Sequence, residues 1–80
     1  MTDIEHDLLD RLINYHNGKL ELSDLIKWLN SNRKTPLIDH IMKKWDDVII
    51  HNKPQMIFVN VLNDTLFILN KKQNRLPDVL

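Results

Sequence analysis

The 80 residues of this chain include no cysteine, and this absence restricts how the chain can be stabilised. No disulfide can staple the fold, and no thiolate nucleophile or cysteine-bound zinc site can be built. A chain of this length provides one hydrophobic core and not two. We therefore expect residues 1–80 to form a single small domain, with an irregular C-terminal tail at about residues 74–80.

The composition narrows the class of protein further. Apolar residues make up 42% of the chain and charged residues 28%, which favours a folded domain over disorder. A single glycine excludes a glycine-rich phosphate loop. The longest nearly uninterrupted apolar stretch, residues 56–62, is far shorter than the roughly 20 residues of a membrane span. We expect no membrane partner.

The acidic N-terminus does not resemble a signal peptide, which favours a cytoplasmic protein. The chain lacks alanine and is rich in asparagine, isoleucine, lysine and leucine. That bias is typical of AT-rich coding sequences. It predicts a low-GC bacterial host, or one of its phages or plasmids, as the source.

The clearest predicted element is a helix that begins after Thr2 and ends at Asn17-Gly18. Thr2 is a favourable N-cap, and Glu5 three residues later completes a capping box, in which each side chain satisfies the free backbone N–H of the other residue. Apolar residues then recur at three- and four-residue steps, which gives one apolar stripe. Gly18 suits the left-handed position that follows a helix C-terminus.

Two further helices are predicted in the middle of the chain. Residues 19–22 alternate polar and apolar side chains, which predicts a very short strand or an extended linker. Ser23 is then the expected N-cap of a helix of about two turns that ends in the polar run 30–34. Thr35-Pro36 starts the third helix, because threonine caps a helix and proline is preorganised for its first position.

The last part of the chain decides the fold class, and its pattern fits two structures. As a helix it would carry one wide apolar face, with Phe67 out of place. As a hairpin, strands 56–62 and 65–70 would turn at Asn63-Asp64. Residue type favours the hairpin, because β-branched and aromatic residues are enriched in strands and asparagine is a poor helix former. We therefore expect an α+β fold of three helices followed by a C-terminal β-hairpin, with an all-α four-helix bundle as the alternative.

This order of elements resembles the winged helix-turn-helix family. The resemblance rests on residues 19–29, Lys-Leu-Glu-Leu-Ser-Asp-Leu-Ile-Lys-Trp-Leu, which look like the strand and second-helix start of many bacterial winged-helix regulators. It implies a DNA-binding transcriptional regulator with residues 35–44 in the major groove and His40 or Asp39 near base edges. The phosphate contacts that it implies come from Arg33, Lys34, Lys43, Lys44 and Lys53.

The charges argue against strong DNA binding. The net charge is zero, whereas a DNA-binding protein usually presents a basic face. Asp39, Asp46 and Asp47 interrupt the five basic side chains around the implied recognition helix and leave a surplus of two cations. These charges are also what the solvated faces of ordinary core-packing helices would carry.

Nothing in the sequence favours an enzyme or a cofactor site. His6 and Asp10 lie one helical turn apart, as do Asp47 and His51, but neither pair has a third ligand nearby in the sequence. The serine and threonine hydroxyls are better used as helix caps. We expect no catalytic, metal-binding or cofactor-binding residues.

Large apolar residues favour a protein-binding function. They supply more bulk than a chain of this size can bury, so some should remain at the surface. Trp28, Trp45 and Phe67 are the candidate contacts, although both tryptophans also fit the apolar stripes of their helices. We expect a small non-enzymatic module that binds a protein partner or a second copy of itself, for example a phage or mobile-element protein that modulates a host protein. A winged-helix DNA-binding regulator is the alternative.

Overall fold

The computed structural model describes residues 2–73, and within them it contains four helices and no strand. The predicted irregular tail at residues 74–80 lies outside the described residues. The helices are α1 (Asp3–His16), α2 (Leu22–Ser31), α3 (Pro36–Ile50) and α4 (Met56–Gln73). The fold is therefore all-α, which confirms the alternative and contradicts the expected α+β fold.

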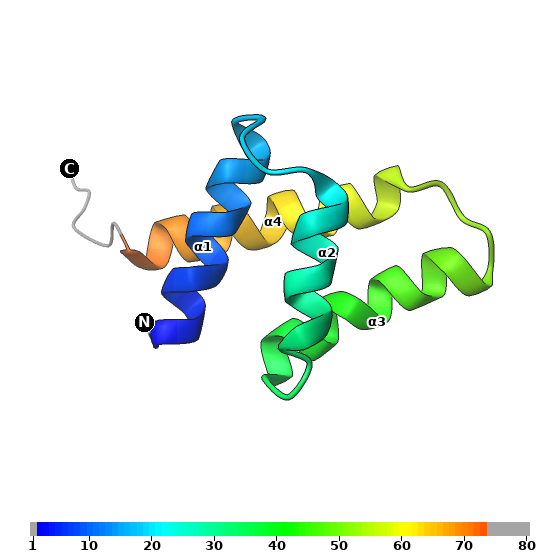
Figure 1. Ribbon diagram of the computed structural model, residues 1–80, viewed down its shortest axis with the longest axis horizontal. Helices are drawn as coiled ribbons and strands as arrows, with labels where there is room; N and C mark the ends of the chain where they lie inside the picture. Colours follow the sequence, from blue (N-terminus) through cyan, green and yellow to red (C-terminus); the bar gives the residue numbers. More distant parts are fainter. Residues whose placement is uncertain (1, 74–80) are drawn as a thin grey trace.

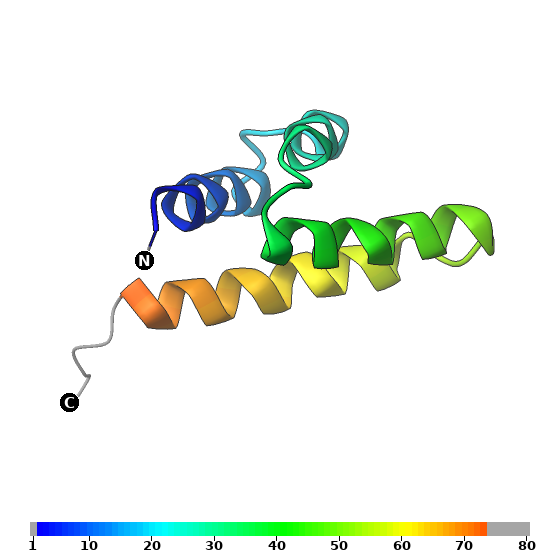
Figure 2. The same cartoon turned by 90° about the horizontal axis from the view of Figure 1, so that it is seen from below.

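The helices form two antiparallel pairs that cross one another. Figure 1 shows the α1–α2 pair running across the α3–α4 pair, and Figure 2 shows the two pairs as two layers. Each helix packs against the next along the chain, and α4 packs back against α1, so the four helices close into a ring. The turn between α3 and α4 lies at one end of an elongated molecule of 43 × 24 × 21 Å.

The N-terminus of α1 has the predicted capping box. The backbone N–H of Glu5 donates to the Thr2 hydroxyl over 3.3 Å, and the backbone N–H of Thr2 donates to Glu5 Oε1 over 2.9 Å. Both bonds satisfy backbone donors that have no partner within the helix. The prediction for this helix start is confirmed.

Helices α1 and α3 end in the same way. Gly18 has φ +77°, and the N–H groups of Gly18 and Lys19 donate to carbonyls of the last helical turn. Asn52 has φ +51° at the corresponding position after α3, and the Lys53 N–H donates to the Val48 carbonyl over 2.9 Å. Glycine and asparagine adopt this left-handed conformation at least cost, so both helices stop where the sequence provides one of them.

The start of α2 was predicted too late. No strand forms at residues 19–22; α2 begins at Leu22, and Glu21 is its N-cap without a side-chain capping bond. Ser23, the expected N-cap, lies inside the helix. The early start places Leu22 one turn before Leu25, so that Leu22 packs partly buried against the core. The packing of Leu22 therefore outweighs the capping hydrogen bond that Ser23 could make as an N-cap.

The expected hairpin at residues 56–70 is wrong, because these residues belong to α4. Phe58, Leu62 and Leu69 are each at most 2% exposed, and their spacing of four and seven residues matches a helical period. The Thr65 hydroxyl donates to the Val61 carbonyl one turn earlier over 2.8 Å, which satisfies a polar group on this side. Packing of one face against the other helices overrides strand propensity. Without a hairpin in residues 2–73, the winged helix-turn-helix resemblance is also wrong.

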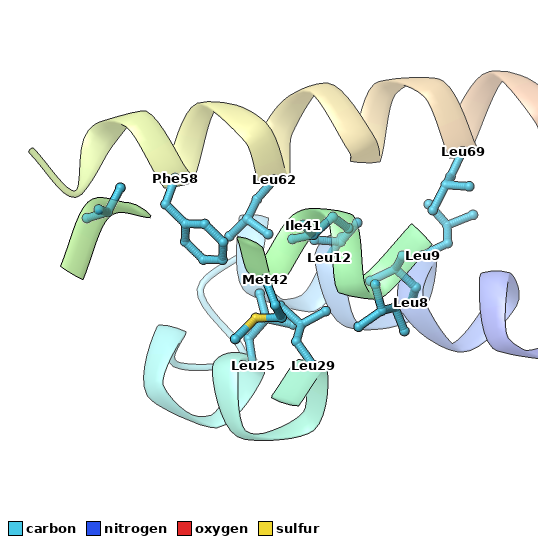
Figure 3. Packing of buried hydrophobic residues seen from close by; sticks show 12 residues of the cluster. Leu8, Leu9, Leu12, Leu25, Leu29, Ile41, Met42, Phe58, Leu62 and Leu69 are labelled. Carbon is cyan, nitrogen blue, oxygen red and sulfur yellow. The ribbon is translucent and has the colours of Figure 1, made fainter. Parts of the chain in front are cut away.

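The core draws on all four helices. Figure 3 shows α4 side chains reaching toward the leucines of α1 and α2 and toward Ile41 and Met42 of α3. No buried side-chain polar atom among the described residues lacks a hydrogen-bond partner. The buried residues are Leu8, Leu9, Leu12, Leu25, Leu29, Ile38, Ile41, Met42, Val48, Phe58, Leu62 and Leu69.

Truncation of a central core residue should destabilise the protein strongly. Leu12 is 1% exposed, so we expect Leu12→Ala to lower the free energy of unfolding by about 2–5 kcal/mol through lost burial and a residual cavity. Ile50→Ala is the control, because Ile50 is 74% exposed, and it should change stability by about 0.5 kcal/mol or less. Urea unfolding measures both. Equal effects of the two substitutions would contradict this core.

The left-handed residue after α1 gives a second test. Gly18→Ala should cost about 1–2 kcal/mol, because alanine resists a positive φ. Apart from Gly18 and its two chain neighbours, no heavy atom lies within 4 Å of a Cβ placed there, so the cost would come from the backbone alone. Asn17→Ala is the matched control, since Asn17 has φ −86°, which alanine adopts readily. Thermal unfolding of both variants checks the difference.

Candidate functional site

Helix α4 carries large apolar residues on all its sides, not only toward the core. At about 100° per residue, seven positions that point away from the core define what we call the α4 outer face. Four are apolar and substantially exposed: Met56 at 62%, Ile57 at 42%, Phe67 at 63% and Ile68 at 58%. The other three are polar: Asn60, Asp64 and, near the C-terminal end of the helix, Lys71. A helix that is apolar all round is usually covered on all sides.

Within the described residues, no helix covers this face. In Figure 2, α4 runs along one side of the molecule, and α1, α2 and α3 all lie on its other side. The core contacts of α4 point toward those three helices (Figure 3). The α4 outer face is therefore the apolar side of a helix left open to solvent.

A shallow groove adjoins this face between α1 and α4. Its volume is about 450 Å³, and Phe67 belongs both to the groove and to the α4 outer face. The Lys71 ammonium lies 5.1 Å from the centre of the Phe67 ring. The groove is lined by Ile13, His16, Asn63, Leu66, Phe67 and Asn70. No aspartate, glutamate, lysine or arginine lines the groove, so it suits an apolar side chain better than a charged ligand.

A second exposed apolar pair lies at the end of α3. Ile49 is 59% exposed and Ile50 is 74% exposed. They precede the turn that leads into Met56 and Ile57 at the start of α4. Most of the exposed large apolar side chains of the described chain therefore belong to α4 or to the adjoining end of α3.

The three predicted protein-binding residues differ in their surroundings. Trp28 is half-buried, and the Arg11 guanidinium lies 4.4 Å from its ring centre. Trp45 is also half-buried and packs against Phe58, with ring centres 4.9 Å apart and planes tilted by 55°. Phe67 alone of the three is exposed. The two tryptophans thus pack within the fold, whereas the Phe67 side chain is accessible to a partner.

Carboxylates neutralise three of the predicted DNA-contacting cations. Arg33 donates two hydrogen bonds to Asp46, over 3.0 and 2.8 Å, in a bidentate pair. This pairing raises the pKa of Arg33 and lowers the pKa of Asp46. Lys43 lies 3.3 Å from Asp39.

The third paired cation is Lys53, which lies at the end of α3. Its ammonium donates to Asp47 Oδ2 over 2.7 Å, and His51 Nδ1 contacts Oδ1 of the same carboxylate over 2.7 Å. The hydrogen bonds from Lys53 and His51 hold the pKa of Asp47 below its usual value. Asp47 and His51 therefore meet as their spacing suggested, but a lysine occupies the other carboxylate oxygen.

The remaining predicted DNA contacts, Lys34, His40 and Lys44, are exposed. Lys34 and Lys44 form no ion pair within residues 2–73. Across those same residues, no group of three histidine, cysteine, aspartate or glutamate side chains could hold a metal ion. No helix of the described part is long and apolar enough to cross a bilayer.

Sequence reasoning identified Phe67 but missed Met56, Ile57 and Ile68. The hairpin prediction placed Ile57 and Ile68 on one face of a sheet and Phe67 on the other, so the helix side that they share stayed hidden. A signal was present: Met56-Ile57 and Phe67-Ile68 are adjacent apolar pairs separated by eleven residues, which is about three helical turns. In a helix, both pairs must point the same way.

Comparison with protein-family models, with curated proteins and with solved structures finds no match to this chain.

One ion pair joins α1 to α4, the first and last helices of the ring. Lys72 of α4 contacts Glu5 of α1 over 3.1 Å, and the Glu5 side chain is only 19% exposed. The backbone N–H of Thr2 and the Lys72 ammonium together lower the pKa of Glu5 from 4.5 to about 2. A carboxyl whose pKa is lower in the folded state stabilises the fold when ionised, above pH 4.5. That stabilisation is lost as the pH falls from 4.5 to about 2.

Removing this carboxylate should make the free energy of unfolding depend less on pH in the acid range. We expect Glu5→Gln to be less stable than wild type at pH 6, and the difference should shrink as the pH falls toward 2. Glu21→Gln is the control, because Glu21 makes no side-chain capping bond. Urea midpoints at several pH values measure the effect. Parallel pH curves for wild type and Glu5→Gln would show that Glu5 does not carry this linkage.

Proposed function

We propose that the chain is a small non-enzymatic protein-binding module that binds its partner through the α4 outer face and the adjoining groove. The observation that carries the proposal is the pair Phe67 and Ile68, which are 63% and 58% exposed on a helix side that no other described element covers. Large uncovered apolar patches on small soluble domains usually mark interaction sites.

The energetics of this face fit protein binding. Full burial of one side chain of this size contributes about 1.5–3 kcal/mol, and the four apolar residues of the face are each roughly half-exposed. Their covering would therefore contribute several kcal/mol in total. The residue types also fit, because interface centres are rich in aromatic residues and methionine and poor in charge. The face carries two charged residues, Asp64 near its middle and Lys71 at its C-terminal end.

DNA binding has less support. Three of its candidate cations are paired with carboxylates of their own chain: Arg33, Lys43 and Lys53. Strong duplex binders neutralise about 6–10 phosphates, and Lys34 and Lys44 are the unpaired lysines of this set. A bacterial or mobile-element origin, and a role in modulating a host protein, remain predictions from composition.

Two matched double variants test the proposed surface. Phe67→Ser/Ile68→Ser removes apolar area from the α4 outer face, and Ile49→Ser/Ile50→Ser removes a similar exposed pair from α3. Serine has nearly the helix propensity of phenylalanine and isoleucine, so both variants should fold. We expect a protein partner, from a bacterial lysate or a second copy, to bind wild type and the α3 variant but to bind the α4 variant at least about ten-fold more weakly.

The same proteins are titrated with random duplex DNA at two salt concentrations. Weak binding with a shallow salt dependence is expected. Two results would defeat the proposal: binding of every protein partner unchanged by Phe67→Ser/Ile68→Ser, or nanomolar DNA binding that collapses with added salt. Circular dichroism confirms that both variants remain helical.

A further inference from the structure

We propose that the partner of the α4 outer face is a second copy of this chain, with the two α4 helices packed antiparallel about a two-fold axis near residue 62. This inference rests on the proposed function and specifies its partner. It follows from the order of residues along the face from 56 to 68, which is apolar, polar and apolar again, with Lys71 beyond the second apolar pair. Such an order is complementary to itself only when one copy is reversed.

The spacing of the two apolar pairs sets the register. Met56-Ile57 and Phe67-Ile68 lie eleven residues apart, which is three turns plus about 20° and a rise of about 16 Å. Both pairs therefore point the same way from α4, and the midpoint between them is residue 62. A two-fold axis at that level brings the first pair of each copy against the second pair of the other.

Each contact in this arrangement joins compatible side chains. Met56 meets Phe67 of the partner subunit, which is a favourable thioether–aromatic contact. Ile57 meets Ile68 of the partner subunit on the other side of the same face. Because the interface is isologous, each contact occurs twice.

The polar centre of the face favours the antiparallel direction. Asn60 lies opposite Asp64 of the partner subunit, so its amide N–H groups can donate to the carboxylate. Asp64 makes no ion pair within residues 2–73 that would compete. A parallel pair would instead set Asp64 against Asp64 of the partner subunit and align the two helix dipoles, and both effects are repulsive.

The size of the face predicts a weak dimer. Helix α4 has 18 residues and is about 27 Å long. Only one side of it would lie in the interface, so each copy would contribute fewer residues than the 20–30 per side of a standard stable interface. We therefore expect a dissociation constant in the micromolar range. The chain would exchange between monomer and dimer over ordinary working concentrations.

Sedimentation velocity across a micromolar concentration series tests association. Wild type should pass from monomer to dimer, Phe67→Ser/Ile68→Ser should dissociate at least about ten-fold more readily, and Ile49→Ser/Ile50→Ser should stay within about two-fold of wild type. Loss of the dimer only in the α3 variant would overturn the inference, because the contact would then lie at the α3–α4 turn.

Cysteine cross-linking tests the direction of packing. Because the chain has no native cysteine, only the introduced thiols can form disulfides. Asn60→Cys and Asp64→Cys chains are mixed in equal amounts and oxidised gently. The antiparallel pair predicts mostly mixed disulfides, because Asn60 faces Asp64 of the partner subunit. Mostly matched disulfides, joining position 60 to 60 and 64 to 64, would overturn the antiparallel arrangement.

The two proposals fail in different ways. A chain that stays monomeric to high micromolar concentration, yet binds another protein in a manner that depends on Phe67 and Ile68, would overturn the dimer and keep the protein-binding module. A monomer whose partners bind independently of Phe67 and Ile68 would overturn both.

Discussion

The packing of one side of α4 against the rest of the chain is the contact on which this structure depends. Phe58, Leu62 and Leu69 are the fully buried residues of that side, and they share one core with the leucines of α1 and α2 and with Ile41 and Met42 of α3 (Figure 3). Without α4, the apolar side chains of α1 and α3 that pack against it would be exposed to solvent. The same helix carries the exposed residues that we assign to partner binding, so fold and proposed function share a single element with two apolar sides.

The sequence predicted the fold unevenly, and the reason is physical. Where a helix boundary depends on a local hydrogen bond or a backbone conformation, as at Thr2, Glu5 and Gly18, the residues specify it directly, and the structure agrees. The start of α2 at Leu22 depends on a packing contact that a propensity argument does not include. For α4, strand-favouring residue types pointed the wrong way, because burial against α1 and α3 outweighed them.

The candidate site could be predicted only in part for the same reason. Phe67 is notable because it does not fit the core face of a helix, and its 63% exposure explains the mismatch. The remaining apolar residues of the α4 outer face become a surface only once the helix is known. Charge pairing was also visible only in part: the sequence set Asp46 and Asp47 near the basic residues, but the bidentate bond to Arg33 spans 13 residues and crosses between elements.

The ring of helices has a consequence for how the chain reaches its fold. Three of its four junctions join consecutive helices, whose association requires closure of only short loops. The fourth, between α1 and α4, joins residues as far apart as Glu5 and Lys72, 67 positions along the chain. Closing that junction carries the largest entropic cost, so the two hairpins can assemble quickly while the docking of α1 on α4 comes last. Substitutions at the α1–α4 junction should then alter the folding rate more than substitutions at the turns within each helix pair.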